Sequence, residues 1–111
     1  MRSKAIVAGV GMTSFGRHLE TGLKALGAKP FIVPAMGSHG GGTAEGQRAI
    51  VEGYGMTEQF LGCPIRATME TVVVCETPEG IPVHFDRYAY EADHVVVVGR
   101  VKPHTNFVGD I

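Results

Sequence analysis

The chain has 111 residues, enough for one domain with a modest core of its own. Hydrophobic residues make up 44% and charged residues 19%, which is the balance of a globular protein rather than a disordered one. The net charge is −1 and neither Lys nor Arg clusters, so a nucleic acid bound along its phosphates is not an expected partner.

The sequence contains no recognisable membrane or export signal. The apolar stretch after the opening "MRSK" is about six residues long, far short of the roughly 20 residues of a membrane span. Two cysteines, Cys63 and Cys75, are too few for a disulfide framework, and Cys75 lies in "VVVCE", where a small buried residue fits. We therefore expect reduced thiols in a cytoplasmic protein that binds neither membrane nor nucleic acid.

The first third of the chain predicts a strand and then a helix. Residues 5–10, "AIVAGV", form a short apolar run typical of a buried strand. Leu19, Leu23 and Leu26 follow at helical spacing and form one apolar stripe, which Pro30 prevents from continuing.

A second strand and a second helix are predicted next, with a glycine-rich loop between them. The strand is "FIV", residues 31–33, and the loop is "PAMGSHGGG", residues 34–42. Residues 43–55 predict a helix with Thr43 as its N-cap and with Glu45 in the first turn, where a carboxylate favours the helix dipole.

The remaining segments predict a hairpin and one more strand. In "ETVVVCETPEGIPVHFD", two β-rich runs flank the turn signature "TPEG". Ile81, Val83 and Phe85 alternate with polar or proline positions, as in a half-buried strand. Residues 94–101, "HVVVVGRV", are the most apolar run and predict a central strand.

Together these elements predict an α/β fold: a largely parallel sheet with flanking helices and an inserted β-hairpin, a partial Rossmann-like domain. Such sheets bind ligands at the carboxyl ends of their strands. Three loops leave those ends, "GVGMTSFG", "GSHGGG" and "KPHTNF", and two of them carry a histidine. We therefore expect His39 and His104 to face one crevice.

Both histidine loops contain residue types suited to binding an anion. Backbone N–H groups of a glycine-rich turn can receive an anion, and an imidazole can exchange a proton at neutral pH. Lys102 and Asn106, beside His104, can hold a carboxylate. The same residues are also compatible with surface loops whose histidines have no function. The candidate cofactor contacts in the first loop are Gly37, Ser38, Gly40, Gly41 and Thr43.

Other familiar motifs are absent from the sequence. The dinucleotide fingerprint would need a glycine where Ser14 stands, and there is no P-loop. His18, His84 and His94 do not have metal-ligand spacing, so we predict no metal site in this chain and treat these histidines as structural.

Two long stretches, "ALGAKPFIVPAMGSHGGGTAEGQ" and "ADHVVVVGRVKPHTNFVGDI", resemble the N-terminal domain of the nickel-pincer lactate racemase family. The resemblance runs over about residues 23–111. It implies that His39 and His104 act as an acid/base pair on the two faces of a 2-hydroxy acid. It also implies that the C2 hydride passes to a nickel-pincer nucleotide, the cofactor of the family.

The chain departs from the family pattern in several places. Gly40 and Gly41 stand where better-known racemases have a basic residue and a proline, which leaves the substrate open. Residues 1–20 are instead similar to the opening of a thiolase, so we expect a foreign or atypical strand-helix segment over 1–22 and a truncated racemase-like domain over 23–111.

The family's cofactor-tethering lysine and its C-terminal domain would lie beyond Ile111, so the chain alone is not expected to retain the cofactor. Two alternatives to a racemase fragment remain at this point. One is a non-catalytic anion- or nucleotide-binding α/β module, and the other is an inactive truncated product.

Overall fold

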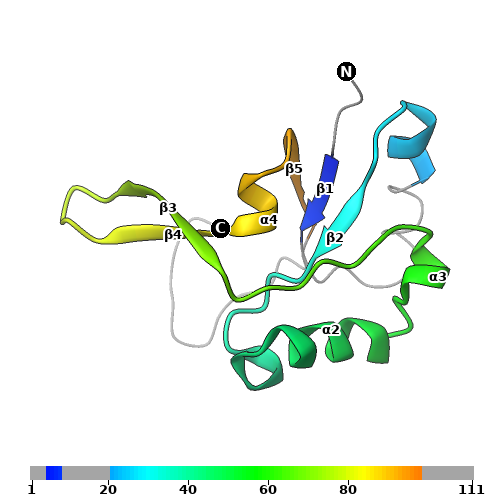
Figure 1. Cartoon of the computed structure of the whole chain (residues 1–111), viewed down its shortest axis with the longest axis horizontal. Coiled ribbons are helices and arrows are strands. Elements are labelled where there is room, and N and C mark those ends of the chain that lie inside the picture. The colour runs from blue at the N-terminus through cyan, green and yellow to red at the C-terminus, as the bar shows by residue number, and fades with distance from the viewer. Residues whose placement is uncertain (1–4, 9–20, 99–111) are drawn as a thin grey trace.

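The computed structural model describes residues 5–8 and 21–98 (Figure 1). Helices and strands are mixed, as the sequence predicts for an α/β chain. Residues 21–25 are helical, and each helix in the described ranges is too short or too polar to span a bilayer. The other elements in chain order are β1 (Ala5–Ala8), β2 (Phe31–Val33), η1 (His39–Gly42), α2 (Ala44–Gly53), α3 (Glu58–Leu61), β3 (Thr71–Glu76), β4 (Pro82–Asp86), α4 (Arg87–Tyr90) and β5 (His94–Val97).

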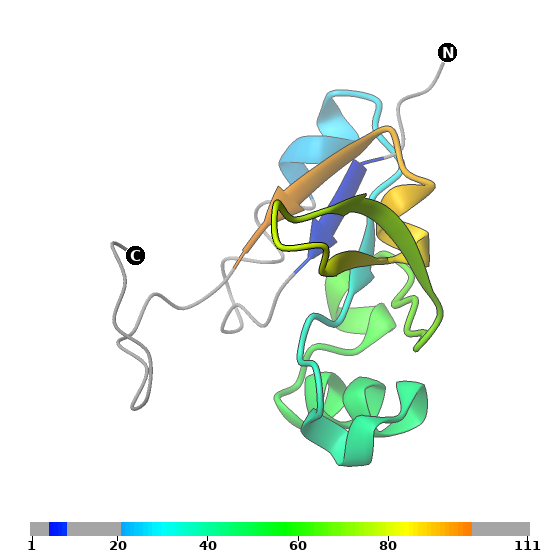
Figure 2. The ribbon, with the colours of Figure 1, turned by 90° about the vertical axis from the view of Figure 1, so that its left-hand side faces the viewer.

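Three strands form a parallel sheet in the order β2-β1-β5 (Figures 1 and 2). Ile6 of β1 is paired with Phe31 of β2 and with Val95 of β5. The expected central strand over 94–101 is therefore wrong for the part described: β1 is central, and β5 has one strand neighbour among the described residues. Val97 is 84% exposed, which shows that an apolar run predicts a strand without predicting its neighbours.

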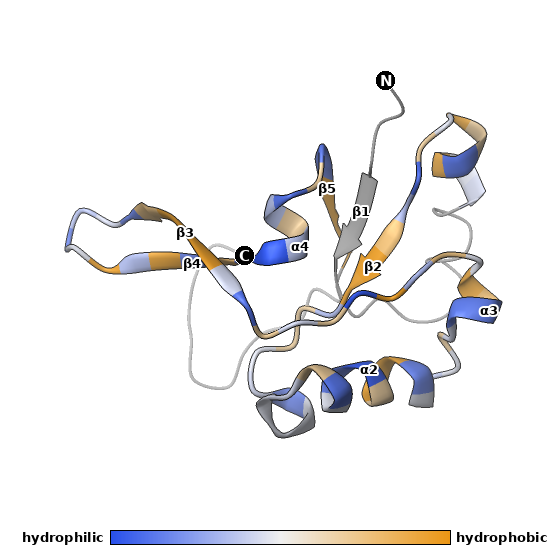
Figure 3. Cartoon of the chain, in the orientation of Figure 1, coloured by the Kyte–Doolittle hydropathy of each residue, from blue (hydrophilic) through white to orange (hydrophobic). Residues whose placement is uncertain are grey.

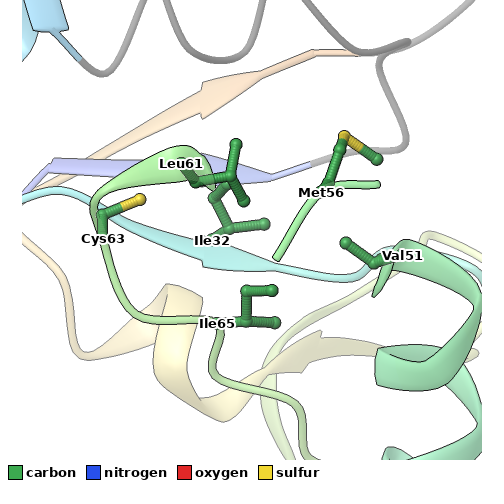
Figure 4. Packing of buried hydrophobic residues seen from close by; sticks show 6 residues of the cluster. All are labelled: Ile32, Val51, Met56, Leu61, Cys63 and Ile65. Carbon is green, nitrogen blue, oxygen red and sulfur yellow. The ribbon is translucent and has the colours of Figure 1, made fainter. Parts of the chain in front are cut away.

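β2 is buried on both faces, and its residues alternate between two clusters as successive strand side chains must. Phe31 and Val33 pack with Ala89 of α4. Ile32 points the other way and packs with residues from α2, α3 and the segment after them (Figure 4). In the hydropathy colouring of Figure 3, β2 is a continuous apolar segment. The Ile32 cluster consists of Ile32, Val51, Met56, Leu61, Cys63 and Ile65.

The segment after α3 also bonds directly to β2. The Ile32 N–H donates to the Pro64 carbonyl at 2.9 Å, and the Arg66 N–H donates to the Ile32 carbonyl at 2.8 Å. Residue 65 thereby forms an isolated parallel bridge with Ile32. This backbone pairing brings the apolar side chains of α3 and residue 65 over β2.

Arg48 joins α2 to the same segment. Its Nε donates to Glu52 at 2.8 Å, and its Nη1 donates to the Ile65 carbonyl at 3.2 Å. Glu58, at the start of α3, accepts the Ile65 N–H at 2.8 Å and lies 3.3 Å from the Arg48 guanidinium. Since α2 follows the glycine loop directly, these bonds place the loop relative to the core.

The predicted helix over 43–55 is confirmed. α2 begins after Thr43, whose Oγ1 accepts the Gly46 N–H at 3.1 Å, and Glu45 lies in its first turn. The prediction of an apolar stripe on the preceding helix is only partly confirmed. Leu23 packs against the Ile32 cluster, but Leu26 is exposed.

The predicted hairpin is confirmed, but its burial is not. β3 and β4 pair antiparallel, and the Gly80 N–H donates to the Thr77 carbonyl at 2.8 Å in the turn. The hairpin extends away from the rest of the described chain (Figure 1). The expectation of a half-buried strand holds at Val83, which is partly buried, but is wrong at Ile81, which is 60% exposed, and at Phe85, which is also exposed.

The two cysteines differ in their surroundings. Both are free thiols, but Cys63 is buried in the Ile32 cluster while Cys75 is exposed on β3. The expectation that Cys75 is buried is therefore wrong. The apolar letters around it belong to a hairpin whose two faces have no covering layer among the described residues.

Candidate functional site

The glycine loop between β2 and α2 depends on backbone conformations that favour glycine. Gly37, Gly40, Gly41 and Gly42 have φ values of 56°, 66°, 71° and 67°. Side chains with a Cβ are strained in this left-handed region. The glycines of "GSHGGG" are therefore needed for the backbone conformation of the turn itself, which lies at the carboxyl end of β2.

One glycine of the loop also approaches α2 closely. A Cβ on Gly40 would lie 2.3 Å from the carbonyl carbon of Gly46, and a Cβ on Gly46 would lie 1.8 Å from the Gly40 oxygen. Neither backbone leaves room for a methyl group on the other. The close approach of Gly46 to the loop was not predicted from the sequence.

His39 projects from the tip of this loop and is held at one ring nitrogen. Its Nδ1 lies 2.7 Å from the Met36 carbonyl oxygen, which also accepts the His39 backbone N–H at 3.1 Å. A carbonyl can only accept, so in the neutral ring the proton lies on Nδ1. Nε2 then carries the lone pair, and the ring is exposed, so this nitrogen can take a proton from a bound molecule.

Two side chains of α2 and its cap hold the loop on either side of His39. The Thr43 hydroxyl donates to the Gly40 carbonyl at 3.1 Å while it accepts the Gly46 N–H. Gln47 donates from Nε2 to the Gly37 carbonyl at 2.7 Å. Gln47 was not predicted from the sequence; its spacing of one helical turn from buried Val51 was the available signal.

The family model of the lactate racemase N-terminal domain matches residues 6–109. The chain belongs to this family. Comparisons with curated proteins and with solved structures found no match. The matched range takes in most of residues 1–22, the segment that the sequence analysis set apart, and it includes the glycine loop.

Only part of the predicted site of this lactate racemase N-terminal domain is described. His104, Lys102 and Asn106 lie outside the described residues, so the convergence of His39 and His104 stays a prediction. Residue 98 is the last described position after β5, and it packs against the Ile32 cluster.

Two other histidines of the domain lie on different elements. His94 begins β5, and in a parallel sheet its end is opposite to the end at which the His39 loop leaves β2. His84 is exposed on the hairpin, with its Nδ1 2.9 Å from the Thr71 hydroxyl.

The predicted cofactor contacts of the domain fall into two groups. Gly40 and Thr43 are engaged within the loop and with α2. Gly37, Ser38 and Gly41 are exposed, and a Cβ on either glycine would meet open space. Within residues 5–8 and 21–98, no three His, Cys, Asp or Glu side chains are grouped as metal ligands.

A shallow depression lies away from this loop. It is lined by Lys24, residues 27–30 and residues 62–64, near the amino end of β2. None of the predicted site residues lines it, so it does not bear on the role of His39.

Proposed function

We propose that this domain supplies an acid/base histidine, His39, to the racemisation of a 2-hydroxy acid. The observation that carries the proposal is the hydrogen bond from Nδ1 to the Met36 carbonyl. Because that bond places the ring proton on Nδ1, the exposed Nε2 is the nitrogen available to a substrate hydroxyl. Family membership supports the reaction class.

In the proposed reaction, Nε2 of His39 takes the proton of the substrate hydroxyl as the O–H bond breaks. The C2–H bond breaks with both of its electrons, and the product is a planar 2-oxo acid. Returning the hydride to the opposite face, with the proton back on oxygen, completes the inversion. A second base is needed for the other enantiomer, and we propose His104 for it, with Lys102 and Asn106 holding the carboxylate.

When bound, the nickel-pincer nucleotide implied by the family resemblance supplies the acceptor for the hydride. Gly37, Ser38 and Gly41 are exposed and would contact such a group, although the Gly37 carbonyl is already held by Gln47. Gly40 and Thr43 are hydrogen-bonded to each other, and Thr43 is also hydrogen-bonded to α2. The described residues thus fit one edge of the nucleotide. The described residues do not group as ligands for a metal ion. The proton transfer at His39 does not depend on the nucleotide.

We further propose that the domain is a partial Rossmann-like fold. The parallel strands β2, β1 and β5 support this, as does the placement of the His39 loop at the carboxyl end of β2. Glu45, in the first turn of α2, puts a carboxylate beside the helix start and so disfavours an alternative role as a simple phosphate-binding module.

Because the chain alone is not expected to retain the cofactor, the test of His39 supplies it with the nickel-pincer nucleotide and with the C-terminal domain of the family. It measures the interconversion of the two enantiomers of lactate and of related 2-hydroxy acids. His39→Asn should lower kcat by about 10²- to 10⁴-fold, because an amide can donate to the Met36 carbonyl but cannot accept the substrate proton. His84→Asn, at an exposed hairpin position, is the matched control and should leave turnover unchanged. Full turnover by His39→Asn, or no racemisation by the wild type, would overturn the proposal.

A solvent-isotope experiment separates hydride transfer from proton abstraction at carbon. Racemisation in D₂O should leave protium at C2, since the hydride does not exchange with solvent. Deuterium at C2 would mean that a base removes the C2 proton, and the hydride step would be wrong while His39 could still be the base.

A further inference from the structure

Gln47 is the buried polar side chain of the described residues, with 4% of its surface exposed. It lies on the core-facing side of α2, one turn before Val51, which is also buried. A polar group in that position is costly unless it is hydrogen-bonded. Its Nε2 donates to the Gly37 carbonyl at 2.7 Å and lies 3.6 Å from the sulfur of Met69.

The carbonyl that Gln47 holds is next to the carbonyl that holds His39. Met36 O accepts both the ring and the backbone N–H of His39, and Gly37 O follows it in the chain. The two carbonyls are separated by the Gly37 Cα, whose φ is +56°. A glycine can leave this conformation at little cost, so a contact outside the loop is needed to select it.

Gln47 is suited to that selection because its side-chain donor reaches from α2 to the Gly37 carbonyl. The helix start is capped by Thr43, which also holds the Gly40 carbonyl beyond His39. Gln47 therefore fixes the near side of the loop while Thr43 fixes the far side. Gln47 lies in α2 and Thr43 is its N-cap, and Arg48 attaches this helix to the core segment around Ile65.

We infer that Gln47 is a positioning residue for His39: by fixing the Gly37 carbonyl, it keeps the Met36 carbonyl aligned with Nδ1 and so keeps Nε2 as the proton-accepting nitrogen. This inference rests on the proposed function for its catalytic meaning. The placement of the ring proton can nevertheless be measured without substrate or cofactor. A residue that only fills space would change stability without changing that placement.

The test is ¹⁵N NMR of the His39 ring at a pH where the imidazole is neutral. In the wild type, Nδ1 should resonate as an N–H nitrogen and Nε2 as a lone-pair nitrogen. Gln47→Met keeps the length of the side chain but removes the donor, and it should shift both ring nitrogens toward a common averaged position. Gln59→Met, at an exposed position of α3, is the matched control and should retain the wild-type pattern.

A second variant keeps the test decisive if Gln47→Met does not fold. In Gln47→Glu, the protonated carboxyl can donate to the Gly37 carbonyl, whereas the carboxylate cannot and repels it. At a pH where the imidazole is neutral, the Gln47→Glu carboxylate should therefore disturb the Gly37 carbonyl, and this variant should lose the wild-type ring pattern as Gln47→Met does. An unchanged wild-type ring pattern in both Gln47 variants, or an Nε2–H ring in the wild type, would overturn the inference.

The outcomes for Gln47 and for the proposed function can be told apart. If the ring pattern depends on Gln47 but His39→Asn keeps full turnover, the positioning stands and the racemase role of His39 fails. If His39→Asn abolishes turnover while Gln47→Met leaves the ring pattern and kcat unchanged, the racemase role of His39 stands and the positioning role of Gln47 fails. Where both stand, Gln47→Met should lower kcat with little change in KM, because the substrate-binding groups are untouched.

Discussion

The Ile32 cluster and the β3–β4 hairpin contain similar apolar residues, but these residues differ in how far they are buried. Residues of β2, α2 and α3 converge on Ile32 and are almost fully buried (Figure 4). The hairpin carries Val73, Val74 and Ile81 into exposed positions. Both of its strands contain apolar segments in the hydropathy colouring of Figure 3. The two regions differ in what packs against them. Several elements surround the Ile32 cluster, whereas the hairpin strands mainly pair with one another.

This contrast locates the support of the candidate site. The glycine loop is tied to α2, and α2 is tied to the Ile32 cluster through Val51 and through Arg48. Met69, just before β3, lies 3.6 Å from Nε2 of Gln47 in α2. Changes in the cluster should therefore reach His39, and changes at the far end of the hairpin should not.

The largest expected effect comes from the cluster. Leu61→Ala should reduce the free energy of unfolding by about 2–5 kcal/mol, because it opens a cavity at a fully buried position. Val73→Thr, on the exposed hairpin, should change it by no more than about 0.5 kcal/mol. Urea unfolding measures both, and equal losses would show that the hairpin has a covering partner.

A smaller effect, with opposite signs, is expected from two glycines of α2. Gly46→Ala should destabilise the fold by about 1–3 kcal/mol, since the added methyl meets the Gly40 backbone. Gly53→Ala, where a Cβ meets nothing within 4 Å, should instead stabilise it by up to about 1 kcal/mol through helix propensity. Thermal melts of the two variants check the signs, and stabilisation by both would contradict the close contact.

Two threonine caps give a matched pair of about equal stability effect. Thr43→Ala and Thr57→Ala each remove an N-cap hydroxyl and should cost about 1 kcal/mol. Only Thr43→Ala also releases the Gly40 carbonyl, so only that variant should move the NMR signals of His39. Identical His39 spectra for both variants would mean that Thr43 does not hold the loop.

The smallest effect concerns the boundary between the hairpin and α4. Asp86 ends β4 and caps α4 by accepting the Ala89 N–H at 3.0 Å. Partial burial raises the pKa of the Asp86 carboxyl above its ordinary value, although hydrogen bonds from Ala89 and Tyr88 oppose the rise. The native state thus holds this proton more tightly than the unfolded state does.

Stability should consequently fall slightly as pH rises from the ordinary Asp pKa through the raised one. Asp86→Asn can still cap the helix, and it should remove this part of the pH dependence while other carboxylates keep theirs. Unfolding by urea over a pH series compares the two slopes. Parallel curves for wild type and variant would show that burial does not act on Asp86.

The local features of the fold were predictable from the sequence. The strand at 31–33, the hairpin turn and the helix capped by Thr43 all follow from short-range rules on periodicity, turn residues and caps. The short helices α3 and α4 were not predicted, because four residues give no periodicity to read.

The features that depend on distant partners were not predictable. The valines of β5 and the residues around Cys75 look as apolar as those of β2, and only the sheet order and the covering elements distinguish them. For the candidate site, His39 was proposed from its glycine setting. Gln47 was not, because a glutamine in a helix usually faces solvent, and its buried position follows from where α2 packs.

The contact between Gly40 and Gly46 has a consequence for recognising similar loops. The two positions should vary together among relatives, since a side chain at either one requires the loop and the helix to separate. A scan that asks for this pair, rather than for a run of glycines, would find loops seated on a helix in this way.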